Sequence, residues 1–257
     1  MPAEEERFQR VWIVHRKDHA DDLWSIRVRG EEKLSFQAGQ YATLGIRDGD
    51  VMIERPYSIV SGPHEDEIEF FFELAPKGDL TPALHSMGIG ETLWMGRQAM
   101  GRFTFDDQSG RRNHFLAGTV TGVAPFVSIV RKMAAEVRGG RAPDHRLVIL
   151  HGASRSWEFG YREELQTLSN DSSWFCYIPT ISRPWEDRSW KGEVGRVDDV
   201  LRKHLDRVGF DPATATVYLC GQPQMILNAK GILHRRGFAK ECIREELYWA
   251  PASGEKT

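Results

Sequence analysis

The spacing of hydrophobic positions changes near residue 106. Before that point the apolar residues form short runs broken by Gly, Asp and Pro, a pattern typical of strands in a β-barrel or sandwich. We expect strands at residues 8–14, 23–28, 41–46, 57–60 and 68–74. A short helix is expected to start beside them, with Thr81 at its N-cap and Pro82 at its first position.

After a polar segment at residues 106–113, runs that resemble strands alternate with runs of helical periodicity. This alternation predicts a parallel sheet with helices on both faces. We therefore predict two domains: an N-terminal antiparallel β-barrel over residues 1–107 and a C-terminal α/β parallel-sheet domain over residues 108–257. The strands of the second domain are expected at 114–117, 147–150, 174–178, 217–220 and 243–249, and its helices at 124–137, 161–168, 197–205 and 225–233.

Composition and charge narrow the class of protein. The 257 residues carry 34 basic and 37 acidic side chains, so nothing indicates a nucleic-acid surface. No stretch approaches the ~20 apolar residues of a membrane helix, and the polar first ten residues predict no signal peptide. Three cysteines, Cys176, Cys220 and Cys242, favour a reducing, cytoplasmic setting over a disulfide framework. They also exclude a cysteine-ligated iron–sulfur cluster in this chain, and no metal site is predicted.

The first group of residues with recognisable chemistry is Arg55-Pro56-Tyr57-Ser58-Ile59. A guanidinium offers two parallel donors to a diphosphate, a tyrosine ring offers a flat apolar surface, and a serine hydroxyl both donates and accepts. Strand alternation puts Arg55 and Tyr57 on one face and Ser58 on the other. The alternative is a solvated arginine beside an ordinary strand tyrosine.

Two glycine-containing turns follow strands elsewhere in the chain. Lys77-Gly78-Asp79-Leu80-Thr81 opens the short helix, where backbone N–H groups can face an anion, although a plain turn is the simpler reading. Gly118-Thr119-Val120-Thr121-Gly122 lies between a strand and a helix, as a phosphate-binding loop does.

A third motif, Cys220-Gly221-Gln222-Pro223, follows an apolar strand, and ligands of α/β sheets bind at such strand ends. The alternative is that Cys220 is a buried small hydrophobe. Cys176 and Cys242 have no comparable context, and we expect both to be structural.

Together these motifs resemble the ferredoxin/flavodoxin–NADP reductase family, in particular its bacterial branch. The resemblance implies that Arg55, Gly78, Leu80 and Thr81 hold the diphosphate of FAD. It also implies that Tyr57 stacks on the isoalloxazine ring, that Ser58 lies beside its N5 atom, and that the motif positions Pro56 and Ile59 contribute to the same site.

The same resemblance assigns the dinucleotide site to Gly118, Thr119, Thr121 and Gly122. The family pattern is G-T-G-T-G-x-A-P, and Val120 stands where its middle glycine is expected. Either the loop tolerates valine because this position is unstrained, or dinucleotide affinity or geometry is altered. We favour tolerance, because the rest of the motif is intact; a loop that binds nothing is the remaining reading.

Near the end of the chain, the resemblance places Cys220, Gly221 and Glu246 beside the nicotinamide. Tyr248 and Trp249 are expected to cover the flavin face on which the nicotinamide stacks, with simple packing as the alternative. Catalytic roles are thus implied for Ser58, Cys220, Glu246 and Tyr248. The residues after Trp249 form a polar tail that is either disordered or modulates access to the flavin.

Coenzyme preference depends on arginines that can bind a 2′-phosphate. Arg155, Arg183 and Arg196 are the candidates, so NADP(H) is favoured and NAD(H) stays open. The function implied is an FAD-dependent oxidoreductase that exchanges hydride with NADP(H) and single electrons with ferredoxin or flavodoxin. The alternatives are an NADH-dependent reductase component of an oxygenase or cytochrome system, a non-catalytic electron-relay subunit, and a binding module without flavin.

Overall fold

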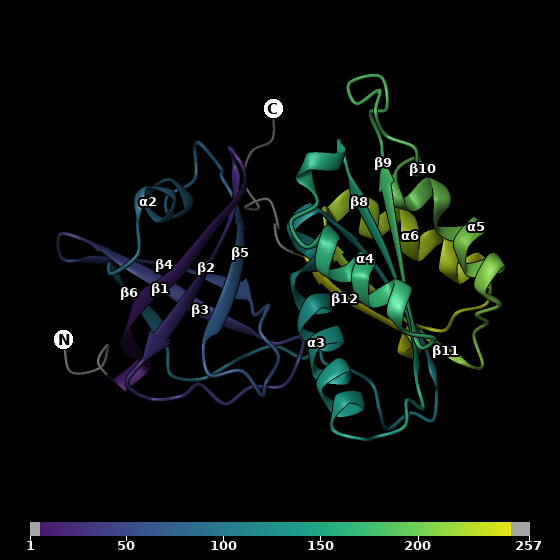
Figure 1. Cartoon of the computed structure of the whole chain (residues 1–257), viewed down its shortest axis with the longest axis horizontal. Helices are drawn as coiled ribbons and strands as arrows, with labels where there is room; N and C mark the ends of the chain where they lie inside the picture. Colours follow the sequence, from purple (N-terminus) through teal and green to yellow (C-terminus); the bar gives the residue numbers. More distant parts are fainter. Residues whose placement is uncertain (1–5, 248–257) are drawn as a thin grey trace. The chain divides into compact units, whose positions relative to one another are not determined.

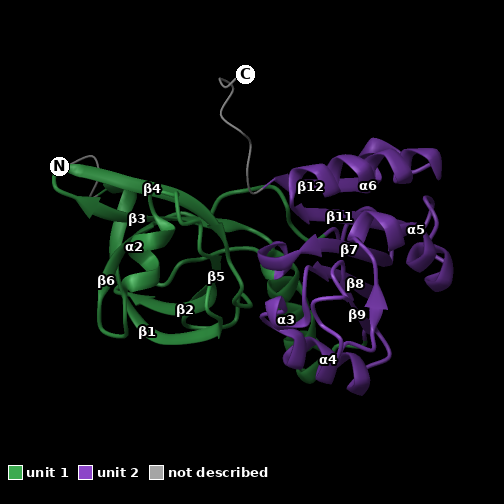
Figure 2. Ribbon diagram, turned by 90° about the horizontal axis from the view of Figure 1, so that it is seen from above, with its two compact units in different colours: residues 1–105, 124–142 green, residues 106–123, 143–257 purple. Residues whose placement is uncertain are grey.

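The computed structural model describes residues 6–247. Two compact units are distinguished by their internal contacts: unit 1 comprises residues 1–105 and 124–142, and unit 2 comprises residues 106–123 and 143–257 (Figure 2). The chain therefore enters unit 2, returns to unit 1 for one segment, and enters unit 2 again. The predicted domain boundary after residue 107 stays a prediction, because units defined by contacts need not fold independently.

Unit 1 is built from antiparallel strands and a short helix. They are β1 (Phe8–Ala20), β2 (Leu23–Gly30), β3 (Tyr41–Asp48), β4 (Val51–Ser58), β5 (Ile68–Glu73), α2 (Thr81–Ser86) and β6 (Thr92–Gly96). The strands form one sheet in the order β4-β3-β6-β1-β2-β5. An antiparallel bridge between Ile59 and Phe70 joins the two ends of this order, so the sheet closes into the predicted barrel (Figure 1).

The barrel core is rich in aliphatic side chains and aromatic rings. Trp24 stacks on Phe72 with ring centroids 5.2 Å apart, and both side chains are buried. The alternation of buried and exposed positions is regular at the start of β1, where Val11 and Ile13 face the core. Strand β6, which pairs with β1 through Leu93, was not predicted, and β4 begins at Val51 rather than at residue 57.

Unit 2 is a parallel sheet with the predicted helices. Its elements are β7 (Asn113–Thr119), η1 (Val120–Val123), β8 (Arg146–Ala153), α4 (Arg162–Asp171), β9 (Phe175–Ile181), β10 (Glu193–Val194), α5 (Val197–Val208), β11 (Ala215–Gly221), α6 (Pro223–Arg235) and β12 (Ile243–Leu247). The order is β10-β9-β8-β7-β11-β12. Helices α5 and α6 pack on the face formed by Phe115, Val148 and Val217, and α4 lies against the other face (Figure 2).

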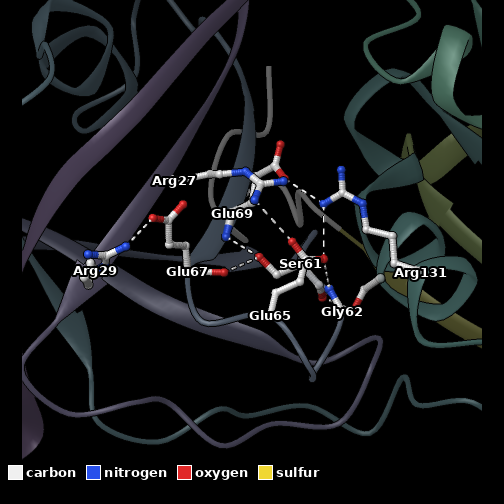
Figure 3. A network of polar contacts seen from close by, with 9 residues as sticks. Arg27, Arg29, Ser61, Gly62, Glu65, Glu67, Glu69 and Arg131 are labelled. Atoms are coloured by element: carbon white, nitrogen blue, oxygen red, sulfur yellow. Dashed lines mark hydrogen bonds and ion pairs between the residues drawn. The ribbon is translucent and has the colours of Figure 1, made fainter. Parts of the chain in front are cut away.

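Helix α3 (Ala124–Arg138) follows η1 directly, yet its contacts assign it to unit 1. Figure 3 shows the polar network that holds it. Arg131 Nη1 lies 2.6 Å from Glu69 Oε2, and Arg27 Nη2 lies 2.9 Å from the same oxygen. The Ser128 hydroxyl donates to the carbonyl oxygen of Ser61 at 2.6 Å. The helix is thus bonded to strand β5 and to the loop that follows β4, while Arg27 of β2 shares the same carboxylate of Glu69.

Among residues 6–247, no helix is long and apolar enough to cross a membrane.

Candidate functional site

In unit 1 the structure brings together the arginine of β4 and the glycine-led loop before α2. Arg55 Nη2 lies 2.5 Å from Asp79 Oδ2, and both side chains are more than half exposed to solvent. Residues separated by more than twenty positions in the sequence therefore meet at one exposed surface, where the Arg55 guanidinium lies beside the loop that contains Gly78. This arrangement has the chemistry that a diphosphate needs.

Tyr57 and Ser58 follow Arg55 with the predicted alternation. Arg55 is exposed, Tyr57 is half-buried and packs against the barrel core, and Ser58 is buried on the opposite face of the strand. Tyr57 packs edge-on against Phe72 with centroids 4.8 Å apart, and burial raises the pKa of its phenol to about 12 despite the nearby Arg55. The phenol therefore stays protonated at neutral pH. Pro56 is exposed and Ile59 is buried in the core.

Thr81 was predicted to be the N-cap of α2, and this prediction is wrong. Leu80 occupies that position, and Thr81 is the first helical residue. The Thr81 hydroxyl instead accepts from the N–H of Ala75 at 3.0 Å and lies 3.3 Å from its carbonyl oxygen, which closes the loop on itself. Its side chain therefore fixes the loop around Gly78 rather than capping the helix, and the buried side chain of Leu80 anchors the same loop.

In unit 2 the two glycine motifs meet at the carboxyl ends of β7 and β11. Strand pairing sets Cys220 opposite Gly118. A Cβ on Gly122 would lie 2.5 Å from the carbonyl oxygen of Cys220, and one on Gly221 would lie 2.3 Å from Thr119 Oγ1. Only glycine permits these approaches. The Thr119 hydroxyl also accepts from the N–H of Gln222 at 3.0 Å, so the two loops are bonded as well as packed.

Glu246 lies beside this junction. Parallel pairing of β11 with β12 sets it opposite Cys220, whose side chain is fully buried. Three of the residues predicted to border the nicotinamide, Cys220, Gly221 and Glu246, are thus neighbours in unit 2. Tyr248 and Trp249 lie outside the described residues.

The expectation that position 120 is unstrained is wrong. Val120 has φ +43°, and it is the only non-glycine residue with positive φ among residues 6–247. This region costs an L-residue about 1–2 kcal/mol, and a β-branched side chain fits it poorly. Two sets of contacts offset the strain. The carbonyl oxygen of Val120 accepts from His151 Nε2 at 2.9 Å, and its side chain packs against the apolar cluster of Ala153, Phe159 and Ile181.

Of the three arginines predicted to bind a 2′-phosphate, the structure brings two together. Arg155 Nη1 lies 3.0 Å from Glu158 Oε1, and Arg155 Nε lies 2.6 Å from Glu186 Oε2. Arg183 Nη1 lies 3.7 Å from the other oxygen of Glu186. Glu186 thus lies between the two arginines. Arg196, at the N-cap of α5, instead lies 3.5 Å from Asp198.

Four residues with clear positions in these sites were not singled out from the sequence. Asp79 and Gln222 lie inside the predicted motifs, but roles were assigned only to the residues next to them. His151 directly follows the strand predicted at residues 147–150, so its position at a strand end was an available signal. No sequence signal distinguished Glu186 from other surface carboxylates, because its role depends on two loops that meet only in the folded chain.

Comparison with known proteins places these features in a family. Residues 116–230 match the model of the oxidoreductase NAD-binding domain. A ferredoxin–NADP reductase A from Sorangium cellulosum is 29% identical over 231 residues, which are 85% of this chain and 80% of that protein. A ferredoxin–NADP reductase from Pseudomonas aeruginosa is 26% identical over 243 residues, 89% of each chain.

Among solved structures, the ferredoxin–NADP⁺ reductase of Neisseria gonorrhoeae with bound FAD and NADP superposes with a TM-score of 0.83 at 24% identity. The match covers 95% of this chain and 99% of that one, so the two chains share the whole two-domain fold. By fold and by its NAD-binding domain, the chain is a two-domain oxidoreductase. Within that class it is similar to the bacterial ferredoxin–NADP reductases, which confirms the resemblance predicted from its motifs.

Proposed function

We propose that this chain is an FAD-dependent reductase that exchanges hydride with NADP(H) and single electrons with ferredoxin or flavodoxin. The observation that carries the proposal is that each predicted motif pair converges within its own unit. Arg55 meets the Gly78 loop in unit 1, and the Gly118 loop meets Cys220-Gly221 in unit 2. The similarity to reductases along more than four fifths of the chain supports the same assignment.

The residues of unit 1 fit FAD. Arg55 would face the diphosphate together with the amides of the Gly78–Thr81 loop, in exchange for its present contact with Asp79. Tyr57 offers a half-buried ring with a protonated phenol, and Ser58 offers a buried hydroxyl on the neighbouring face. Bound FAD would supply the conversion between a two-electron hydride and single electrons.

In unit 2, Thr119 and Gly122 pack the dinucleotide loop against Cys220 and Gly221, and this loop, which leads from a strand into a helix, would hold the diphosphate. Cys220 and Glu246 would border the nicotinamide and orient it. Arg155 and Arg183 would contact a 2′-phosphate, which is the basis for assigning NADP(H) over NAD(H).

The proposal is tested by mixing FAD-loaded protein with NADPH or NADH in a stopped-flow instrument and following flavin absorbance near 450 nm. We expect fast bleaching by NADPH, slower bleaching by NADH, and reoxidation by added ferredoxin or flavodoxin. Efficient bleaching by NADH alone would instead indicate the reductase component of an oxygenase or cytochrome system. Bound flavin that neither nucleotide bleaches would indicate an electron-relay subunit, and failure to bind flavin would overturn the flavoprotein assignment.

A further inference from the structure

At Val120 of the dinucleotide loop, the backbone adopts a conformation that its side chain disfavours. Its φ of +43° suits glycine, yet the residue is β-branched. Strained backbone of this kind persists only where the surrounding structure fixes it. The question is therefore which group fixes it, and what the fixed conformation contributes to the loop.

The hydrogen bonds around His151 settle which nitrogen carries its proton. The carbonyl oxygen of Val120 can only accept, so His151 Nε2, at 2.9 Å, must be the donor. Burial lowers the pKa of His151 to about 4, so the ring is neutral at pH 7 and its Nδ1 must accept. Its partner at 3.0 Å is the Tyr177 hydroxyl, which therefore donates. Burial raises the pKa of Tyr177, so that proton is retained.

The imidazole has little freedom to turn. His151 has no exposed surface, and Phe159 packs edge-on against its ring with centroids 4.9 Å apart. The same Phe159 belongs to the cluster that receives the Val120 side chain, together with Ala153 and Ile181. One aromatic ring thus supports both the donor and the residue that it holds.

This bond has a direct consequence for the loop. No cis peptide bond is found among the described residues, so the peptide between Val120 and Thr121 is trans. Its carbonyl and its N–H then point in opposite directions. Because the Val120 carbonyl points toward His151 in strand β8, the N–H of Thr121 points away from that strand. The orientation of a loop amide is thereby set by a buried side chain.

We propose that His151 is a positioning residue for the dinucleotide loop, which holds the Val120 carbonyl so that the loop keeps a phosphate-binding conformation despite its valine. The inference rests on the proposed function, since it concerns how that function's coenzyme is bound. It also accounts for the missing glycine: the hydrogen bond from His151 and the packing of the valine side chain replace the conformational freedom that glycine would bring.

A double-mutant cycle tests this proposal. NADP⁺ is titrated by calorimetry into four FAD-loaded proteins: the natural chain, His151→Leu, Val120→Gly and the double variant. We expect His151→Leu to weaken NADP⁺ binding about tenfold in the natural background, the usual scale for one hydrogen bond. In the Val120→Gly background the same change should cost less than about twofold, because glycine adopts positive φ without help.

His151→Gln is the conservative control, since its amide can donate to the same carbonyl and should restore most of the affinity. Tyr177→Phe should weaken NADP⁺ binding a few-fold, because it removes the donor that fixes the tautomer; it also serves if His151→Leu does not fold. Equal losses from His151→Leu in both backgrounds, or no loss in either, would overturn the proposal. If the natural chain itself binds neither NADP⁺ nor NADPH, the proposed function fails instead.

Discussion

At the scale of single residues, Arg55 shows how one side chain can serve two partners. Its guanidinium is half exposed and lies against Asp79 of the Gly78 loop. An exposed pair of this kind adds little stability, about 0–1 kcal/mol. Asp79 therefore orients the guanidinium at small cost, and a diphosphate with more negative charge can displace the carboxylate.

We expect Arg55→Lys to weaken FAD binding about tenfold and Arg55→Met about a hundredfold. Lysine keeps the charge but loses the paired donors, and charge-assisted bonds to phosphate contribute roughly 1.5–3 kcal/mol. Flavin retained after ultrafiltration at a series of protein concentrations measures both. Arg10→Lys, on the exposed face of β1, is the matched control and should retain flavin as the natural chain does. Equal retention by Arg55→Met would remove Arg55 from the flavin site.

A second residue-scale prediction concerns His114, which is buried in β7. Its Nε2 lies 2.8 Å from His145 Nδ1, and burial, aided by the charge of His145, lowers its pKa to about 3. In the unfolded chain the pKa is about 6.5, so between these values the unfolded state binds more protons. His114 therefore contributes stability that is complete above about pH 6.5 and lost at about 1.4 kcal/mol per pH unit as the pH falls towards 3.

Urea unfolding at pH 7 and pH 5.5 checks this dependence. The free energy of unfolding should fall less between these two pH values in His114→Gln than in the natural chain, by roughly one kilocalorie per mole. A His114→Gln protein with the pH dependence of the natural chain would contradict the prediction.

At the scale of elements, the loops after β8 and β9 are joined by carboxylates. Glu158 Oε2 accepts from the N–H of Ser154 at 2.7 Å, and Asp187 accepts from the N–H of Ser156 at 3.0 Å. The N–H of Arg183 donates to the carbonyl oxygen of Ser154 at 3.0 Å. Acidic residues thus order the candidate 2′-phosphate site, and one of them, Glu158, also pairs with Arg155 and would compete with a phosphate for it.

Glu186 should therefore lower the preference for NADPH. In Glu186→Gln the two arginines keep a hydrogen-bonding neighbour but lose a negative charge, so a 2′-phosphate meets less repulsion. We expect the ratio of kcat/KM for NADPH to that for NADH to rise about three- to tenfold, chiefly through the KM for NADPH. Glu163→Gln, an exposed carboxylate at the start of α4, is the control. An unchanged ratio would show that the coenzyme does not approach Glu186.

The same scale shows what the sequence could predict. Strand and helix periodicity located most elements, because buried positions repeat every second residue near the start of β1 and at helical spacing in α5, while β7 is a continuous buried run. Strand β6 was missed because its five residues carry no clear alternation. The motifs drew attention to Thr119 and Gly221, and the structure brings these two residues into contact. They could not predict the φ of Val120, because His151 and the apolar cluster reach that position only through tertiary contacts.

At the scale of the whole molecule, α3 is the segment that leads the chain from the dinucleotide loop back into the barrel unit. It follows the dinucleotide loop without a linker, and its contacts belong to the barrel unit. Its anchor is Glu69, whose side chain is 7% exposed and accepts from both Arg131 and Arg27 (Figure 3). A predicted fragment of residues 1–107 would lack this helix and leave the buried carboxylate with one cation fewer.

Arg131→Met tests how much that anchor contributes. Removing one partner of a buried ion pair costs about 3–5 kcal/mol, and the remaining contact with Arg27 should reduce this to about 2 kcal/mol. We expect the free energy of unfolding, measured in urea with bound flavin as the reporter, to fall by that amount. Lys132→Met, the next residue of α3, removes a more exposed pair with Glu136 and should cost less than about 0.5 kcal/mol.

Because α3 continues from the dinucleotide loop, Arg131→Met should also weaken NADP⁺ binding a few-fold while Lys132→Met does not. Loss of stability without loss of NADP⁺ affinity would show that the loop is fixed within unit 2 alone, by His151 and by Gly221.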